Sequence, residues 1–86
     1  MEIHRKQDIP WRKIEENALV VNPKTSLIYP LNPVASRIWE LLDGQNNLGR
    51  ITGIILKEYD IDKDTFNKDM ESFILQLEEA GLIEKK

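Results

Sequence analysis

The 86-residue sequence contains no cysteine and a single histidine, His4. Without cysteine the chain can form no disulfide, no thiolate nucleophile and no cysteine-ligated metal site. One histidine near the N-terminus provides no Ser–His–acid or Cys–His set on which general-base catalysis would depend. These absences argue against an enzyme, and we expect no catalytic residue and no cofactor in this chain.

Long apolar runs are also missing, since no segment approaches the roughly 18 residues that a membrane-spanning helix requires. The basic beginning, MEIHRKQDIPWRK, is not followed by an apolar segment and therefore differs from a secretory signal. We expect a cytoplasmic protein that contacts no membrane. A chain of 86 residues can bury one small core, so the sequence predicts a single domain over residues 1–86, with residues 1–9 as a flexible arm.

Glycine is scarce and scattered, with four in the chain, so no glycine-rich phosphate loop can be assembled. Residues 60–64 read DIDKD and have the spacing of a calcium loop, but the sixth position, which requires glycine, is Thr65. These carboxylates suit the N-terminus of a helix instead. The sequence therefore predicts neither a phosphate loop nor a metal site.

The first third of the chain has the composition of β-strands. Residues 11–15, 18–22 and 26–31 read WRKIE, ALVVN and SLIYPL, which are rich in β-branched and aromatic residues. Asn22-Pro23 predicts a type I turn between the second and third segments. Pro30 lacks a backbone N–H, so the third strand should lie at an edge. We predict a three-stranded antiparallel sheet.

Residues 32–44 predict a short helix with clear ends. Asn32 is a good N-cap, Pro33 suits the first helical position, and Gly44 suits the left-handed position after the helix. Most of this helix is apolar, so it should contact other elements on two or three sides, with Trp39 in the core. Its narrow polar stripe consists of Ser36, Glu40 and Asp43.

A second helix is predicted over residues 48–59, with Asn47 as its N-cap, and a third over residues 63–80, capped by Asp62 or Asp64. Ile74 lies at the margin of the third helix's core face and Leu75 nearly opposite. That face recurs at helical spacing as Phe66, Met70, Phe73 and Leu77. Three strands followed by three helices predict an α+β fold, and the helices resemble a helix-turn-helix unit.

The third predicted helix carries five carboxylates against Lys63 and Lys68. Such a surface repels phosphates. Only five residues follow Gly81, too few for the hairpin wing that a winged helix usually places after its recognition helix. We therefore expect no nucleic-acid partner, although a winged-helix DNA-binding regulator stays an alternative.

Peptide binding needs no reactive residue, only an exposed edge or groove. The third predicted strand, residues 26–31, is short, apolar and at an edge, where an extended peptide can add as a further strand. With Ile74 as an apolar shoulder beside it, the strand and the third helix would border a groove. A homodimeric structural subunit could use the same edge, and this is the second alternative.

The order and spacing of these features resemble the PqqD family, the pyrroloquinoline quinone (PQQ) biosynthesis protein D-like domains, also called RiPP recognition elements. The resemblance covers about residues 10–83, and Trp11 and the ALVV strand fit its beginning. Asn47 stands where such proteins often begin the second helix with a small hydroxyl residue. The matching residues are Leu31-Asn32, Ala35, Ile38, Glu40-Leu41, Asp43-Gly44, Ile51, Leu56, Asp69, Phe73-Ile74, Leu77 and Leu82-Ile83.

The resemblance implies a winged helix-turn-helix-like fold with the sheet at the N-terminus. It also implies a non-catalytic adaptor that binds the leader of a ribosomally synthesised precursor peptide as an added strand and presents it to a modifying enzyme, often a radical SAM enzyme. The pathway, PQQ biosynthesis or another peptide modification, stays open. By position, the implied peptide-binding residues are Leu27, Ile28, Tyr29, Asn67, Met70, Glu71 and Ile74.

Overall fold

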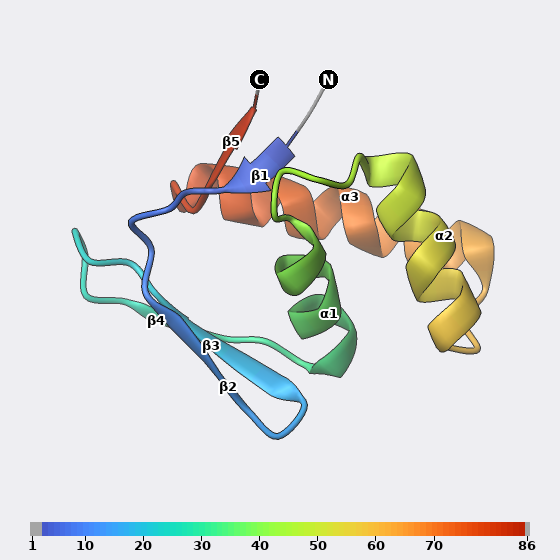
Figure 1. Cartoon of the computed structure of the whole chain (residues 1–86), viewed down its shortest axis with the longest axis horizontal. Helices are drawn as coiled ribbons and strands as arrows, with labels where there is room; N and C mark the ends of the chain where they lie inside the picture. Colours follow the sequence, from blue (N-terminus) through green and yellow to red (C-terminus); the bar gives the residue numbers. More distant parts are fainter. Residues whose placement is uncertain (1–2, 86) are drawn as a thin grey trace.

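The computed structural model describes residues 3–85, in which strands β2, β3 and β4 form an antiparallel sheet that the three helices follow (Figure 1). This confirms the predicted α+β fold with a sheet before three helices. None of the helices within residues 3–85 is long and apolar enough to span a bilayer. The elements are β1 (Ile3–Arg5), β2 (Trp11–Ile14), β3 (Asn17–Val21), β4 (Ile28–Pro30), α1 (Pro33–Leu41), α2 (Leu48–Glu58), α3 (Lys63–Glu79) and β5 (Ile83–Lys85).

Each helix begins at an Asn or Asp whose side chain replaces a missing backbone partner. Asn32, Asn47 and Asp62 each accept a hydrogen bond from the backbone N–H three residues ahead, at 2.8, 2.8 and 3.0 Å. Gly44 and Gly81 follow α1 and α3 with φ of +86° and +74°, a conformation that costs glycine least. The predicted helix ends are therefore confirmed within a few residues.

Helix α1 packs on the inner face of the sheet. Trp39 is fully buried, as predicted, and its ring meets that of Trp11 of β2 edge to face, with centroids 6.3 Å apart. Ser36 is also fully buried, which contradicts its predicted place in a polar stripe. Its hydroxyl accepts from the N–H of Ala18 at 2.7 Å and donates to the carbonyl of Leu31 at 3.2 Å. Because both partners are satisfied, the buried hydroxyl costs little.

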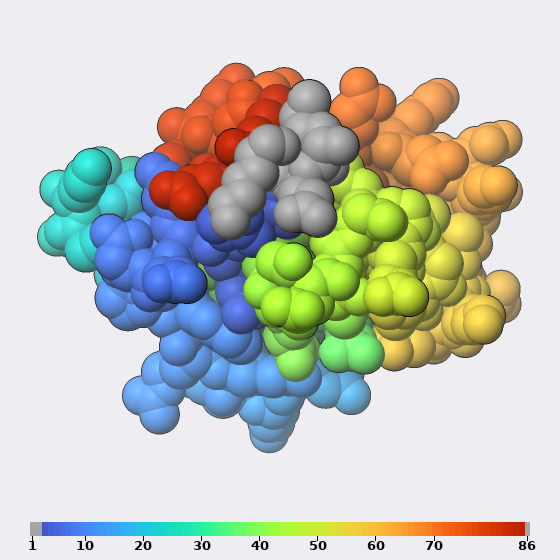
Figure 2. All heavy atoms as spheres, turned by 45° about the horizontal axis from the view of Figure 1, so that its top comes forward, coloured from blue at the N-terminus to red at the C-terminus, as the bar shows by residue number. Residues whose placement is uncertain are grey.

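The N-terminal segment is not the flexible arm that the sequence predicted for residues 1–9. Strand β1 pairs with β5, with Ile3 opposite Lys85 and Arg5 opposite Ile83. The side chains of Ile3, Ile9 and Ile83 are buried. Figure 2 shows the blue N-terminal segment against the red C-terminal strand and the green connection between α1 and α2. Residues 1–2 of the predicted arm lie outside the described residues.

Arg5 anchors this segment to the rest of the molecule. Its guanidinium donates to the carbonyls of Trp39 and Glu40 at 3.0 and 3.1 Å, near the C-terminal end of α1, where carbonyls carry partial negative charge. It also lies 5.1 Å from the ring centroid of Trp11 and 5.9 Å from that of Trp39, a favourable cation–π arrangement. These contacts explain why a basic, polar segment is ordered.

Candidate functional site

Two adjoining hollows separate β4 and the start of α1 from α3. The first, here called the Tyr29 hollow, has a volume of about 360 Å³, and the second, the Val34 hollow, about 300 Å³. Phe73 lines both, so together they form one groove. The Tyr29 hollow includes Tyr29, Leu31, Gln76, Glu79 and Ala80. The Val34 hollow includes Val34, Ala35, Ile38, Ile61, Asp69 and Met70.

Strand β4 forms one wall of the groove and leaves one side of its backbone free, because it is the last strand in the order β2-β3-β4. The N–H of Leu31 and the carbonyl of Leu27 are bonded on the β3 side, each at 2.9 Å. Backbone groups of an antiparallel strand alternate in direction, so those of Ile28 and Pro30 point away from β3. Pro30 has no N–H. The free edge of β4 therefore offers one N–H and two carbonyls.

The side chains of β4 alternate between the two faces of the sheet. Tyr29 pairs with the fully buried Val20 of β3, is half-buried and lines the groove. Ile28, by contrast, is 61% exposed on the outer face. Tyr29 and the following Leu31 therefore form the side-chain wall of the groove, and the free backbone of β4 forms its rim.

Helix α3 borders the groove with a different flank from the one that the sequence indicated. Asp69, Phe73 and Gln76, at i, i+4 and i+7, line the hollows. Ile74, predicted at the margin of the core, is buried with 8% exposure. Phe73, predicted within the core face, is only half-buried. The buried face of α3 is therefore rotated toward Ile74, which leaves Phe73 open to the groove.

The residues that the sequence placed in the site do not all come together. Tyr29 and Met70 line the groove. The two residues before Tyr29 are 55% and 61% exposed, outside the hollows. Asn67 and Glu71 are exposed on the flank of α3 turned away from the groove, on the side of the buried Ile74. The sequence-based set was Leu27, Ile28, Tyr29, Asn67, Met70, Glu71 and Ile74.

Sequence reasoning missed Leu31, Val34, Asp69 and Gln76 as groove residues. One usable signal was present in β4, because period-2 alternation places Leu31 on the same side as Tyr29. The other was a second stripe on α3, beginning at Asp69 with helical spacing. The sequence could not show which of two stripes faces the strand.

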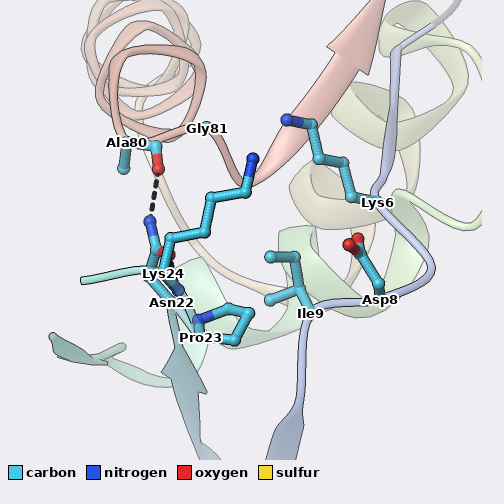
Figure 3. Close-up of a pocket in the computed structure, with 8 residues that line it drawn as sticks. All are labelled: Lys6, Asp8, Ile9, Asn22, Pro23, Lys24, Ala80 and Gly81. Carbon is cyan, nitrogen blue, oxygen red and sulfur yellow. Dashed lines mark hydrogen bonds between the residues drawn. The ribbon is translucent and has the colours of Figure 1, made fainter. Parts of the chain in front are cut away.

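At the end of the groove beside the C-terminus of α3, Asn22 connects the turn before β4 to the helix. Its side-chain N–H donates to the carbonyl of Ala80 at 2.9 Å, and its Oδ1 accepts from the N–H of Lys24 at 2.9 Å (Figure 3). The turn before β4 is thereby tied to α3. A small cavity of about 90 Å³ lies here, with the ammonium groups of Lys6 and Lys24 directed toward the helix end. Cations stabilise such an end because its carbonyls carry partial negative charge.

Two charged interactions outside the groove fix the helices around it. Hydrogen bonds from the backbone N–H and hydroxyl of Thr65 lower the pKa of Asp62 below its ordinary value, which stabilises the N-terminus of α3. Arg37 of α1 donates two hydrogen bonds to Glu58 of α2, both at 2.9 Å. These bonds lower the pKa of Glu58 and raise that of Arg37.

The groove thus combines three features that suit an extended chain. One wall has unpaired backbone groups, the floor is apolar, and the other wall carries the carboxylates of Asp69 and Glu79. An extended chain can use the first for hydrogen bonds and the second for alternate side chains.

Two solved structures share this fold. One, described as TbiB1 in complex with the TbiA(beta) leader peptide, is 25% identical, with a TM-score of 0.86 and 96% of each chain covered. The other, lasso peptide synthetase B1 complexed with the leader peptide, is 15% identical, with a TM-score of 0.83, covering 99% of this chain and 100% of that one. No curated protein matches the sequence.

The family model of coenzyme PQQ synthesis protein D (PqqD) matches residues 17–83, from β3 to the beginning of β5. The match covers the strand edge, all three helices and the groove between them, and it confirms the resemblance predicted from the sequence. The chain therefore belongs to the PqqD family.

Proposed function

We propose that this protein is a non-catalytic adaptor that binds the leader of a ribosomally synthesised precursor peptide and presents it to a modifying enzyme. The observation that carries this proposal is the free edge of β4, which faces α3 across the Tyr29 hollow and adjoins the Val34 hollow. A peptide lying there would add to the sheet and place alternate side chains in the hollows. The two structures of the same fold, both described as complexes with leader peptides, support it.

The modifying enzyme in this proposal is a radical SAM enzyme or another peptide-modifying enzyme, as the family resemblance implies. The complex would form in the cytoplasm, where ribosomes release the precursor. The adaptor itself contributes binding and orientation, and the chemistry belongs to the enzyme.

Strand β4 can make three hydrogen bonds to an added strand, because the N–H of Ile28 donates one and the carbonyls of Ile28 and Pro30 accept two. Each such bond contributes about 0.5–1.5 kcal/mol net, which is too little for specific binding. Apolar burial at about 25 cal/mol per Å² adds the larger share. We therefore expect the hollows to supply most of the affinity, and the single N–H of Ile28 to fix the register.

The decisive experiment substitutes Ile28 by proline and measures binding by calorimetry. The ligand is a synthetic leader segment taken from a candidate precursor peptide. The N–H of Ile28 faces away from β3, so its removal leaves the sheet intact while the proline ring blocks an incoming strand. We expect at least about tenfold weaker binding from the lost hydrogen bond and the clash.

The matched control is Ile28→Ala, which keeps the N–H and removes only a side chain that is 61% exposed. It should change the affinity less than about threefold, in line with its exposure. A folded Ile28→Pro protein that binds the leader as tightly as the wild type would overturn strand addition to β4.

A further inference from the structure

The charged residues that line the Tyr29 hollow and the Val34 hollow are both acidic. Asp69 lies in the wall of the Val34 hollow and Glu79 in the wall of the Tyr29 hollow, and no other charged residue lines either. Both side chains come from α3 and both are exposed. The opposite wall, formed by β4 and the start of α1, contributes only uncharged residues.

These two carboxylates have no cationic partner within residues 3–85. Three other acidic residues of the same region do have one: Glu40, Glu58 and Glu78 lie 2.7–2.9 Å from Lys13, Arg37 and Lys85. The two hollows therefore carry negative charge without an ion-pair partner among residues 3–85, beside apolar lining residues. A ligand of matching chemistry has apolar side chains with cationic side chains next to them.

The distance between the two carboxylates sets the spacing that is expected between cationic side chains of the ligand. Asp69 and Glu79 are ten positions apart on α3, which corresponds to roughly 15 Å along a helix rising about 1.5 Å per residue. An extended peptide advances about 3.3 Å per residue. Cationic side chains that reach both carboxylates would therefore be about four to five residues apart.

We propose that the bound leader segment is basic as well as apolar, with Lys or Arg residues opposite Asp69 and Glu79 and apolar side chains in the adjoining hollows. This inference rests on the proposed function and specifies the substrate class of the same groove. Acidic or uncharged leaders of equal apolar content would then be rejected or bound less tightly.

The test selects ligands from a displayed library of random peptides about 12 residues long, which more than covers the groove at ~3.3 Å per residue. The wild type should enrich peptides with two basic residues about four to five positions apart, beside apolar residues. The charge-reversed double variant Asp69→Lys/Glu79→Lys should enrich acidic residues at these positions instead.

A matched pair of neutral variants measures the same effect on one selected peptide. Asp69→Asn/Glu79→Gln should weaken its binding about three- to tenfold, as expected for two exposed ion pairs, with a loss of salt dependence between about 50 and 500 mM. Asp64→Asn/Glu71→Gln changes the same residue types on α3 outside the groove. This control should change the affinity less than about twofold.

The outcomes separate the two proposals. Peptides that lose binding to the Ile28→Pro variant but carry no basic enrichment would overturn the charge preference and leave the leader-binding function standing. If no selected peptide depends on Ile28, strand addition to β4 is overturned, and the proposed mode of leader binding fails as well.

Discussion

The two flanks of helix α3 have matching compositions and different surroundings. Each has carboxylate, amide and large apolar residues. On the groove flank these include Asp69, Gln76 and Phe73, and on the other flank they include Glu71, Asn67 and Ile74. Phe73 is open to the groove beside β4, whereas Ile74 is buried in the core. The neighbouring strand, and not the composition of the flank, therefore determines which flank borders the groove.

The largest effect is expected from Ile74→Asp, which places a carboxylate in the core. An unpaired buried charge costs about 3–5 kcal/mol, so the free energy of unfolding in urea should fall by about that amount. Leu75→Asp is the control, because Leu75 is 54% exposed and a surface change should stay within about 0.5 kcal/mol. A fully stable Ile74→Asp protein would contradict the assignment of this flank to the core.

Phe73→Ala should weaken peptide binding about tenfold or more while destabilising the fold less than Ile74→Asp does. The substitution removes the apolar wall that both hollows share, and burying a Phe side chain is worth about 1.5–3 kcal/mol. Calorimetry with a groove-binding peptide measures the loss, and Leu75→Ala on the far side of the helix serves as control. Equal losses in the two variants would mean that the groove flank has no special role.

Asn67→Ala and Glu71→Ala test the flank that the sequence indicated. Both side chains are exposed and neither lines the groove, so each should change peptide affinity less than about twofold. The affinity of each variant is measured by calorimetry with the same groove-binding peptide. Losses of about tenfold would mean that the peptide contacts the flank predicted from the sequence, and not the Phe73 flank.

The smallest expected effect is on the pH dependence of stability and concerns Asp62, the N-cap of α3. Its pKa is lowered below the ordinary 3.8 by the hydrogen bonds from Thr65. The contribution to stability is therefore complete above that ordinary value and is lost as the pH falls through the lowered pKa. Asp62→Ser keeps an uncharged N-cap, so its urea midpoint should fall less than that of the wild type on acidification. If the urea midpoints of the wild type and Asp62→Ser fall equally with pH, the charge of Asp62 does not contribute to stability as expected.

Features that depend on local sequence were predicted well. Asn32 and Asn47 were identified as N-caps, and Asp62 was one of two candidates, because a cap interacts with the N–H three residues ahead. The fully buried Trp39 followed from the nearly all-apolar circumference of its helix. Strand β4 was placed at an edge because Pro30 cannot donate to a sheet.

Features that depend on distant residues were not predictable in the same way. The pairing of β1 with β5 joins segments about 80 residues apart, each three residues long and mostly polar, so neither has a recognisable strand pattern. The flank of α3 that borders the groove could not be predicted, because Phe73 and Ile74 are adjacent apolar residues and helical periodicity cannot decide which one turns toward β4. Ser36 was misplaced because its burial depends on Ala18 and Leu31.

Pro30 also bears on whether the molecule can associate with itself. Two copies meeting edge to edge along β4 would bring only two N–H donors, one Ile28 from each, so no register of that contact closes more than two hydrogen bonds. A peptide brings donors of its own and closes three. Natural proteins protect exposed edges from sheet growth with proline, and here we expect it to leave the edge of β4 open to a foreign strand while disfavouring a homodimer through the same surface.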